Sequence, residues 1–139
     1  MSKKNSWLIL LPLLSALLIT ACRSKKDDTP RRLEILFLGH SSEHHNSGQF
    51  AGILSKAFFK DGINITYTTE IEDLNTENLD KYDGLILYAN YDTIQPAQEK
   101  ALLNFVKSGK GFIPLHCASY CFRNSPEVVE LIGGQFLTH

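Results

Sequence analysis

The sequence predicts an α/β fold, a parallel sheet in flavodoxin-like, doubly wound order with helices on both faces. Short apolar runs alternate with segments of helical periodicity along residues 33–139, which is typical of parallel sheets. The runs at 33–38 and 84–88 are almost continuously apolar, and this favours strands that are buried on both faces. Residues that begin or end helices separate the segments.

The first part of this domain predicts a strand, a helix and a second strand. Residues 33–38 form the first strand. Asn46 and Gln49 have the spacing of a capping box, which begins a helix, and Gly62 ends it. Residues 63–68 alternate in polarity and are rich in β-branched side chains, so we expect a strand nearer an edge. The apolar face of the helix carries Phe50, Ile53, Leu54, Ala57 and Phe58.

The middle of the domain predicts two further strands and two helices. A short helix at 76–82 precedes the third strand at 84–88, and Pro96 suits the first position of the next helix. The fourth strand, at 111–115, contains Pro114. Proline removes a donor from the ladder, so we expect pairing to loosen there. The apolar face of the helix after Pro96 carries Ala97, Ala101, Leu102, Phe105 and Val106.

The last segments predict a helix and the start of another strand. Ser125 and Pro126 begin the helix, and Gly133 ends it. The residues after Gly133 have the character of a loop that runs into a new strand. We therefore expect further strands beyond His139, with the carboxyl-terminal part of the domain missing from this sequence.

The first 21 residues predict a signal peptide of the lipoprotein type. Lys3 and Lys4 precede an apolar run at 7–19, which is shorter than the ~20 residues that a membrane-spanning helix needs. Cys22 follows a small residue directly after this run, a pattern that resembles a bacterial lipoprotein box. Lipidation of Cys22 would anchor the protein in the cell envelope, on the outer membrane and facing the periplasm or the surface. The alternative is an ordinary signal peptide followed by an unmodified cysteine.

A polar tether at 22–32 separates the signal peptide from the domain at 33–139. It has no apolar residue after the cysteine and cannot join a core. Residues 26–28 resemble the export signal of surface lipoproteins, with a solvated run of charges as the alternative. From Leu33 onward, 7 Lys and Arg stand against 13 Asp and Glu, a formal charge of −6, which argues against nucleic acid as a partner.

Residues capable of chemistry follow two of the predicted strands. In open α/β sheets, ligands bind beyond the carboxyl ends of the strands. His40 follows the first strand, and His44 and His45 lie in the loop after it. His116 and Cys117 follow the fourth strand. We therefore expect these side chains at one edge of the sheet.

Three motifs follow one another along the domain. They are Gly39-His40 with its His-rich loop, the segment Gly-Lys-Gly-Phe-Ile-Pro-Leu-His-Cys-Ala-Ser at 109–119, and Leu-Ile-Gly-Gly-Gln-Phe-x-x-His at 131–139. In this order they resemble the trehalose-utilisation (ThuA-like) family of the class I glutamine amidotransferase-like superfamily. The resemblance covers residues 33–139, about the first half of a family domain. It implies an amidotransferase-like fold and a role in disaccharide or keto-sugar catabolism, with a small sugar as substrate.

In the amidotransferases, a nucleophilic cysteine sits at a strand-to-helix elbow between glycines. By this resemblance Cys117 takes that position, but its neighbours are His116 and Ala118, which makes a tight elbow harder to form. The partner histidine and acid lie later in that superfamily, beyond His139, so a triad cannot be carried over. Cys117 is either a nucleophile activated at a helix N-terminus or a small buried apolar residue. Cys121 either forms a disulfide with it or is a second reduced thiol.

The histidines at this edge allow three interpretations. They can hold a divalent metal such as zinc. They can instead be acid–base groups, with His40, His116 and Cys117 as catalytic residues, or hydrogen-bond donors to a sugar. They can also be incidental surface residues. The candidate metal set comprises His40, His44, His45 and His116, and Glu43 and Cys117 complete the plausible site.

A polar segment follows the third strand at the same edge. Asn90 and Asp92 can hydrogen-bond sugar hydroxyls, and Tyr91 can stack on a sugar ring, with a plain helix-entry loop as the alternative. The sequence thus supports three hypotheses. The first is an exported enzyme of sugar catabolism, and the second is a non-catalytic envelope module that binds carbohydrate or protein. The third and weaker one is a hydrolase that depends on Cys117.

Overall fold

The computed structural model describes residues 30–40, 42 and 44–138. The predictions for the signal peptide, for Cys22 and for most of the tether lie outside the described residues, as do Glu43 and His139. Within the described part of the chain, none of the helices has the length and apolar character needed to cross a membrane.

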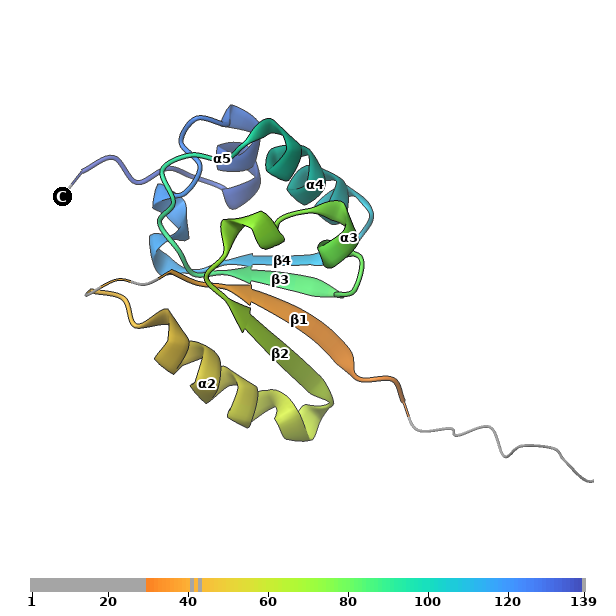
Figure 1. The fold of residues 1–139 in the computed structure, drawn as a ribbon. Helices are drawn as coiled ribbons and strands as arrows, with labels where there is room; N and C mark the ends of the chain where they lie inside the picture. The colour runs from red at the N-terminus through yellow and green to blue at the C-terminus, as the bar shows by residue number, and fades with distance from the viewer. Residues whose placement is uncertain (1–29, 41, 43, 139) are drawn as a thin grey trace, which may run out of the picture. The chain divides into compact units, whose positions relative to one another are not determined.

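Four parallel strands form one sheet in the order β2-β1-β3-β4 (Figure 1). This confirms the predicted α/β class and flavodoxin-like order, including the position of the second strand at an edge. Leu38 pairs with Thr68 on one side and with Leu87 on the other, and Leu87 pairs with Pro114. The carboxyl ends of the strands are therefore level. The strands are β1 (Leu33–Leu38), β2 (Ile63–Thr68), β3 (Gly84–Leu87) and β4 (Gly111–Pro114).

Helices cover both faces of the sheet, with α2 on one face and α3, α4 and α5 on the other (Figure 1). The predicted caps are present: the side chain of Asn46 accepts the N–H of Gln49, and that of Ser125 accepts the N–H of Val128. Gly62 adopts the left-handed conformation that ends the segment after α2. The helices are α2 (Ser47–Phe58), α3 (Thr76–Leu79), α4 (Pro96–Lys107) and α5 (Pro126–Ile132), with 3₁₀ turns at Phe59–Asp61, Ile71–Asp73 and His116–Tyr120.

The alternation of side chains along β1 and β3 builds two cores. Leu36 and Leu38 belong to the larger core under α4 and α5, whereas Phe37 belongs to the smaller core beside α2. All three side chains are almost fully buried, as expected for a strand with helices on both faces. The smaller core reaches Tyr88 and Cys117, so it leads directly to the carboxyl ends of the strands.

The predicted apolar face of α2 is wrong in orientation. Phe50 and Ile53 are 45% and 53% exposed, while Ser47 and Ala51 are buried against the sheet. The helix lies close to the sheet, since a Cβ on Gly48 would stand 3.6 Å from the hydroxyl of Tyr67. Phe50 reaches the smaller core only with its ring, which meets Tyr88 edge-on with 5.6 Å between the ring centres. Of the predicted face, Leu54 alone is partly buried, and Ala97 on α4 is likewise exposed.

The expected loosening at Pro114 is also absent. Gly111 and Leu115 both donate their backbone N–H to β3, at the carbonyls of Asp83 and Leu87. Because successive residues of a strand direct their N–H groups to opposite sides, the nitrogen of Pro114 faces away from β3. It lies on the outer side of β4, the edge of the described sheet, where its missing donor costs no bond to β3.

We predict that Gly39→Ala destabilises the fold by about 1–3 kcal/mol, because the added methyl overpacks a fixed contact. Its Cβ would lie 2.5 Å from the Ser47 oxygen and 2.7 Å from the Tyr67 ring. Ser47 cannot move aside freely, since its hydroxyl bonds the His40 backbone and the Tyr67 hydroxyl. The measurement is the urea midpoint of unfolding.

The matched control is Gly52→Ala, whose Cβ would have nothing within 4 Å. This position lies inside α2, where alanine is favoured over glycine by roughly 0.5–1 kcal/mol. Equal midpoints for the two variants would contradict the packing described at Gly39.

Candidate functional site

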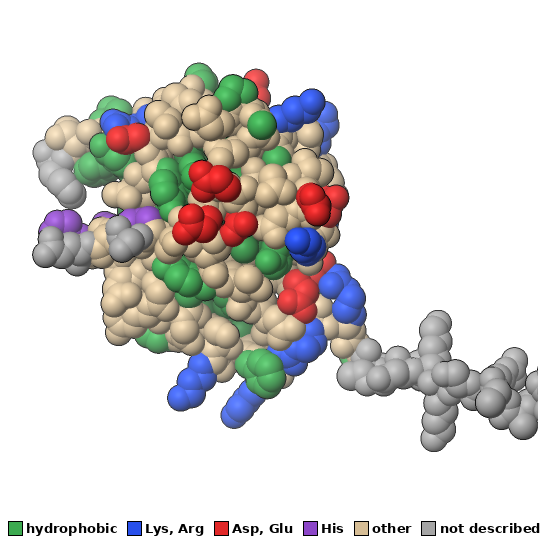
Figure 2. Space-filling view, in the orientation of Figure 1, with side chains coloured by type: hydrophobic (Ala, Val, Ile, Leu, Met, Phe, Trp, Pro, Cys, Tyr) green, Lys and Arg blue, Asp and Glu red, His purple; other side chains and the backbone are tan. Residues whose placement is uncertain are grey.

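The loops after β1, β3 and β4 meet at the carboxyl edge of the sheet. In Figure 2, histidine side chains gather at the end of the molecule to which the strand arrows of Figure 1 point. A pocket of about 500 Å³ opens there. It lies where open α/β sheets bind ligands. The pocket is lined by His45, Asn90, His116, Cys117, Ser119, Tyr120 and Phe136.

Three of the four candidate histidines come together at this edge. The ring centres of His45 and His116 are 4.9 Å apart, and those of His40 and His45 are 5.9 Å apart. Tyr88 contacts both His45 and His116 edge-on, at 6.1 Å in each case. His44 is exposed, and none of the ring contacts found among the described residues includes it.

His40 is buried and carries an orphaned nitrogen. Its Nδ1 lies 3.2 Å from the carbonyl oxygen of Tyr88, and a carbonyl can only accept, so Nδ1 must carry the proton. Nε2 then presents a lone pair, and it is buried with no hydrogen-bond partner among the described residues. Burial lowers the pKa of His40, against the raising effect of the bond to Tyr88, and the nearby His45 lowers it further. His40 is therefore a neutral imidazole with a free acceptor.

His116 occupies the turn at the end of β4 with φ of 48°. This left-handed conformation costs a non-glycine residue about 1–2 kcal/mol, and such strain clusters at functional sites. The family resemblance predicts Cys117 at the strand-to-helix elbow, but the residue with positive φ there is His116. Its imidazole is exposed at the mouth of the pocket.

The thiol of Cys117 is buried, and burial raises its pKa. The lowering expected at a helix N-terminus is not found, so the thiol stays protonated at neutral pH. Cys121 donates its S–H to the carbonyl of Ala89 at 3.0 Å, and burial raises its pKa to about 12. Both cysteines are free, which fits the alternative of two reduced thiols.

The three candidates after β3 lie in different surroundings. Asn90 is exposed and lines the pocket. Tyr91 instead turns inward: its hydroxyl bonds the carbonyl oxygens of Gly39 and Thr69, and burial raises its pKa to about 12. Asp92 forms an ion pair with Arg123 at 2.6 Å and does not line the pocket. The geometry therefore supports a ligand contact for Asn90 and a structural role for Tyr91.

Sequence reasoning did not assign Ser119, Tyr120 and Phe136 to the site. Ser119 and Tyr120 follow His116 within the same 3₁₀ turn. Their nearness to His116 in the sequence is the one local sign that they belong to the site. Phe136 comes from the segment after α5, where its N–H bonds the carbonyl of Ser119 at 2.9 Å. That contact brings the ring of Phe136 to 6.4 Å from the ring of Tyr120, measured between the ring centres. No local sequence pattern indicates that Phe136 reaches the pocket.

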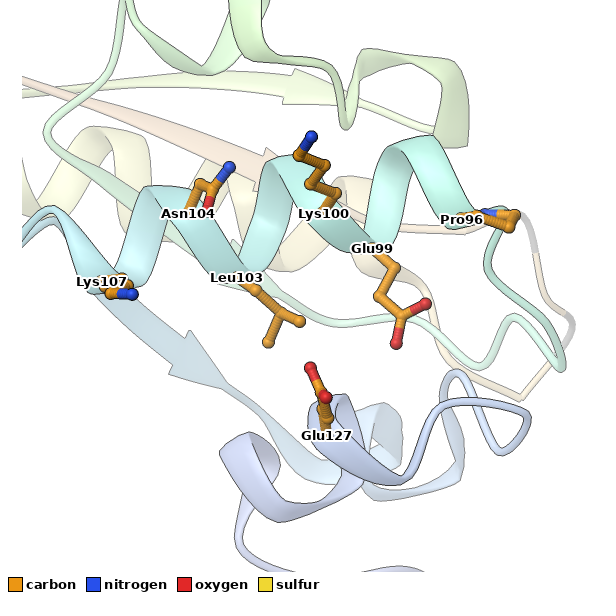
Figure 3. Close-up of a pocket in the computed structure, with 7 residues that line it drawn as sticks. All are labelled: Pro96, Glu99, Lys100, Leu103, Asn104, Lys107 and Glu127. Carbon is orange, nitrogen blue, oxygen red and sulfur yellow. The ribbon is translucent and has the colours of Figure 1, made fainter.

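A second cavity, of about 580 Å³, lies along the outer side of α4. Figure 3 shows Glu99 and Glu127 pointing toward each other from α4 and α5. Glu99 accepts a hydrogen bond from Ser125, the N-cap of α5. The position of the Glu99 side chain therefore has a structural explanation. The cavity contains no residue from the strand ends. It is lined by Pro96, Glu99, Lys100, Leu103, Asn104, Lys107 and Glu127.

Comparison with known proteins identifies the fold family. Residues 34–139 match the model of the ThuA family, which is described as trehalose utilisation. The chain belongs to the ThuA family. A crystal structure from Bacteroides uniformis, of a protein described as ThuA-like, superposes with a TM-score of 0.61 at 22% identity. The match covers 81% of this chain and 47% of that protein.

The ThuA-family chain thus spans about half the length of its structural neighbour, and at this identity the likeness establishes the fold. None of the curated proteins matches the chain. The match of residues 34–139 to the family model confirms the resemblance that the three sequence motifs indicated.

We predict that Tyr91→Phe lowers the free energy of unfolding by about 1–2 kcal/mol, because two carbonyls lose their shared donor. Tyr120→Phe is the matched control, since no hydrogen bond of its hydroxyl is found in the described residues, and it should leave stability unchanged. Thermal unfolding of both variants measures the difference. If Tyr91→Phe unfolds at the same temperature as the wild type, the hydrogen bonds of Tyr91 do not stabilise the loops after β1 and β2.

Proposed function

We propose that the chain is an exported ThuA-family lipoprotein that binds a sugar at the carboxyl edge of its sheet and acts in disaccharide or keto-sugar catabolism. The observation that carries the proposal is the pocket of about 500 Å³ at that edge. Small-molecule sites commonly occupy about 300–1,000 Å³. Lipidation of Cys22, and attachment to the outer membrane through it, belong to the same proposal.

The lining of the pocket suits a sugar. The amide of Asn90, the hydroxyl of Ser119 and two imidazoles can exchange hydrogen bonds with sugar hydroxyls. The rings of Tyr120 and Phe136 lie 6.4 Å apart and offer apolar surface to the C–H face of a pyranose. Few polar groups set into an apolar wall are typical of sites that orient a small ligand.

Histidine is the side chain best suited to chemistry in this pocket. A positioned imidazole can take a proton from a sugar hydroxyl or from the carbon beside a ketone. His116 and His45 both line the pocket. Cys117 is a poor candidate nucleophile because its thiol is buried and its pKa is raised. These observations favour acid–base chemistry over a cysteine-dependent hydrolase.

We predict that Asn90→Ala weakens the binding of trehalose or a keto-disaccharide about tenfold, the effect of losing one hydrogen bond of about 1.4 kcal/mol. Asn104→Ala is the matched control, because Asn104 lies on the outer side of α4 and should bind as the wild type does. Calorimetric titration gives both affinities. Equal affinities for the two variants would place the sugar elsewhere.

A second variant separates catalysis from binding. His116→Asn keeps a residue that tolerates the left-handed turn but removes the imidazole. For an enzyme, we expect turnover to fall at least about 100-fold, the loss of one acid–base group, with sugar affinity falling by no more than the roughly tenfold of one lost hydrogen bond. Absence of turnover in the wild type, together with lost binding in the variant, would instead indicate a non-catalytic binding module.

A further inference from the structure

We propose that His45, His116 and Cys117 form a binding site for a zinc-type divalent cation in the wall of the pocket. Their ligand atoms, one ring nitrogen from each histidine and the sulfur of Cys117, lie within 4.8 Å of one another. Of the residues that the sequence suggested for a metal site, this set keeps His45, His116 and Cys117 and leaves out His40 and His44. The proposal goes beyond sugar binding and does not depend on it. A ring nitrogen that holds the cation cannot also take a proton, so the acid–base role of His45 and His116 described above applies to the metal-free site.

The backbone at His116 brings two of these ligands to one side. Along an extended strand, adjacent side chains point to opposite faces, so His116 and Cys117 would diverge. The turn with φ of 48° at His116, followed by the 3₁₀ turn at His116–Tyr120, reverses this divergence. The strained conformation therefore has a role: it places a nitrogen and a sulfur beside His45.

The spacing is close to that of a bound cation. Zinc binds nitrogen at about 2.0–2.1 Å and sulfur at about 2.3 Å in a tetrahedron, which separates ligand atoms by roughly 3.4–3.7 Å. Closing from 4.8 Å requires each ligand atom to move by less than about 1 Å. The side chains can rotate this far, since His116 is exposed and His45 is only partly buried.

The ligand atoms are also uncommitted and of a suitable kind. Among the described residues, no hydrogen bond to a ring nitrogen of His45 or His116 is found, and Cys117 is not in a disulfide. Two imidazoles and a thiol, without a carboxylate, select zinc-type ions over magnesium or calcium. Binding would release the proton of the Cys117 thiol to solvent.

Three protein ligands leave a fourth position, which is the arrangement of catalytic zinc sites. All three ligands line the pocket of about 500 Å³, so water or a sugar oxygen can reach that position. His40 adds a second, independent observation. Its buried Nε2 has no donor, and its ring lies 5.9 Å from that of His45. A water held by the cation beside His45 would supply the donor that this nitrogen lacks.

The test is a titration of the full metal-free chain with Co²⁺, a spectroscopic substitute for Zn²⁺, followed by competition with Zn²⁺. We expect one equivalent to produce the visible absorption of tetrahedral cobalt and a near-ultraviolet thiolate-to-cobalt band, both displaced by Zn²⁺. His45→Ala should weaken binding at least about 100-fold, because even residues behind the ligands change affinity by about 10–100-fold. Cys117→Ala should abolish the thiolate band.

His44→Ala is the matched control, because it removes the adjacent histidine from the same loop without touching the set, and it should bind as the wild type does. Circular dichroism of each variant before titration shows that it is folded. The proposal is overturned if the wild type gives no thiolate band, if the band persists in Cys117→Ala, or if His44→Ala and His45→Ala bind equally. Since no sugar is present, these outcomes are independent of the proposed sugar binding.

Discussion

The hydroxyl of Ser47 is the contact on which the carboxyl edge of the sheet depends. It accepts the N–H of His40 at 3.1 Å, donates to the carbonyl of the same residue at 2.7 Å, and meets the hydroxyl of Tyr67 at 2.9 Å. One side chain therefore ties the first turn of α2 to β2 and fixes the peptide from which the His40 ring projects. His45 lies between His40 and Ser47 in the sequence, and because these two residues are bonded to each other, the position of His45 is constrained as well.

A second tie acts between the loops. The hydroxyl of Tyr91 bonds the backbone after β1 and the backbone after β2, and the N–H of Phe122 bonds the carbonyl of Tyr91 at 2.8 Å. Tyr91, which follows β3, thereby connects the segments after β1, β2 and β4. These ties are neutral hydrogen bonds in buried or partly buried surroundings, which salt screens far less than exposed ion pairs. The ties at Ser47 and Tyr91 are therefore expected to persist at high salt.

Much of this architecture can be predicted because it depends on local chemistry. The caps at Asn46 and Ser125 bond N–H groups only three residues away, and the level strand ends bring His40 and His116 to the same edge. What depends on distant contacts cannot be predicted in this way. Periodicity identifies the apolar stripe of α2, but packing against β-strands distant in sequence leaves Ala51 buried and Phe50 45% exposed beside Tyr88. Likewise, nothing near Tyr91 in the sequence indicates that its partners are carbonyls 52 and 22 residues away.

The proline in β4 also has a consequence for association. Unpaired strand edges recruit other strands, and proteins often guard them against indiscriminate pairing. A strand that adds beside β4 would find no donor at Pro114, so one of its carbonyls would need water or a side chain instead. Ile113, the residue before Pro114, has an exposed apolar side chain that a neighbouring strand could bury. On the outer side of β4 in the described sheet, a paired strand therefore lacks one backbone donor at Pro114, whichever segment or chain supplies that strand.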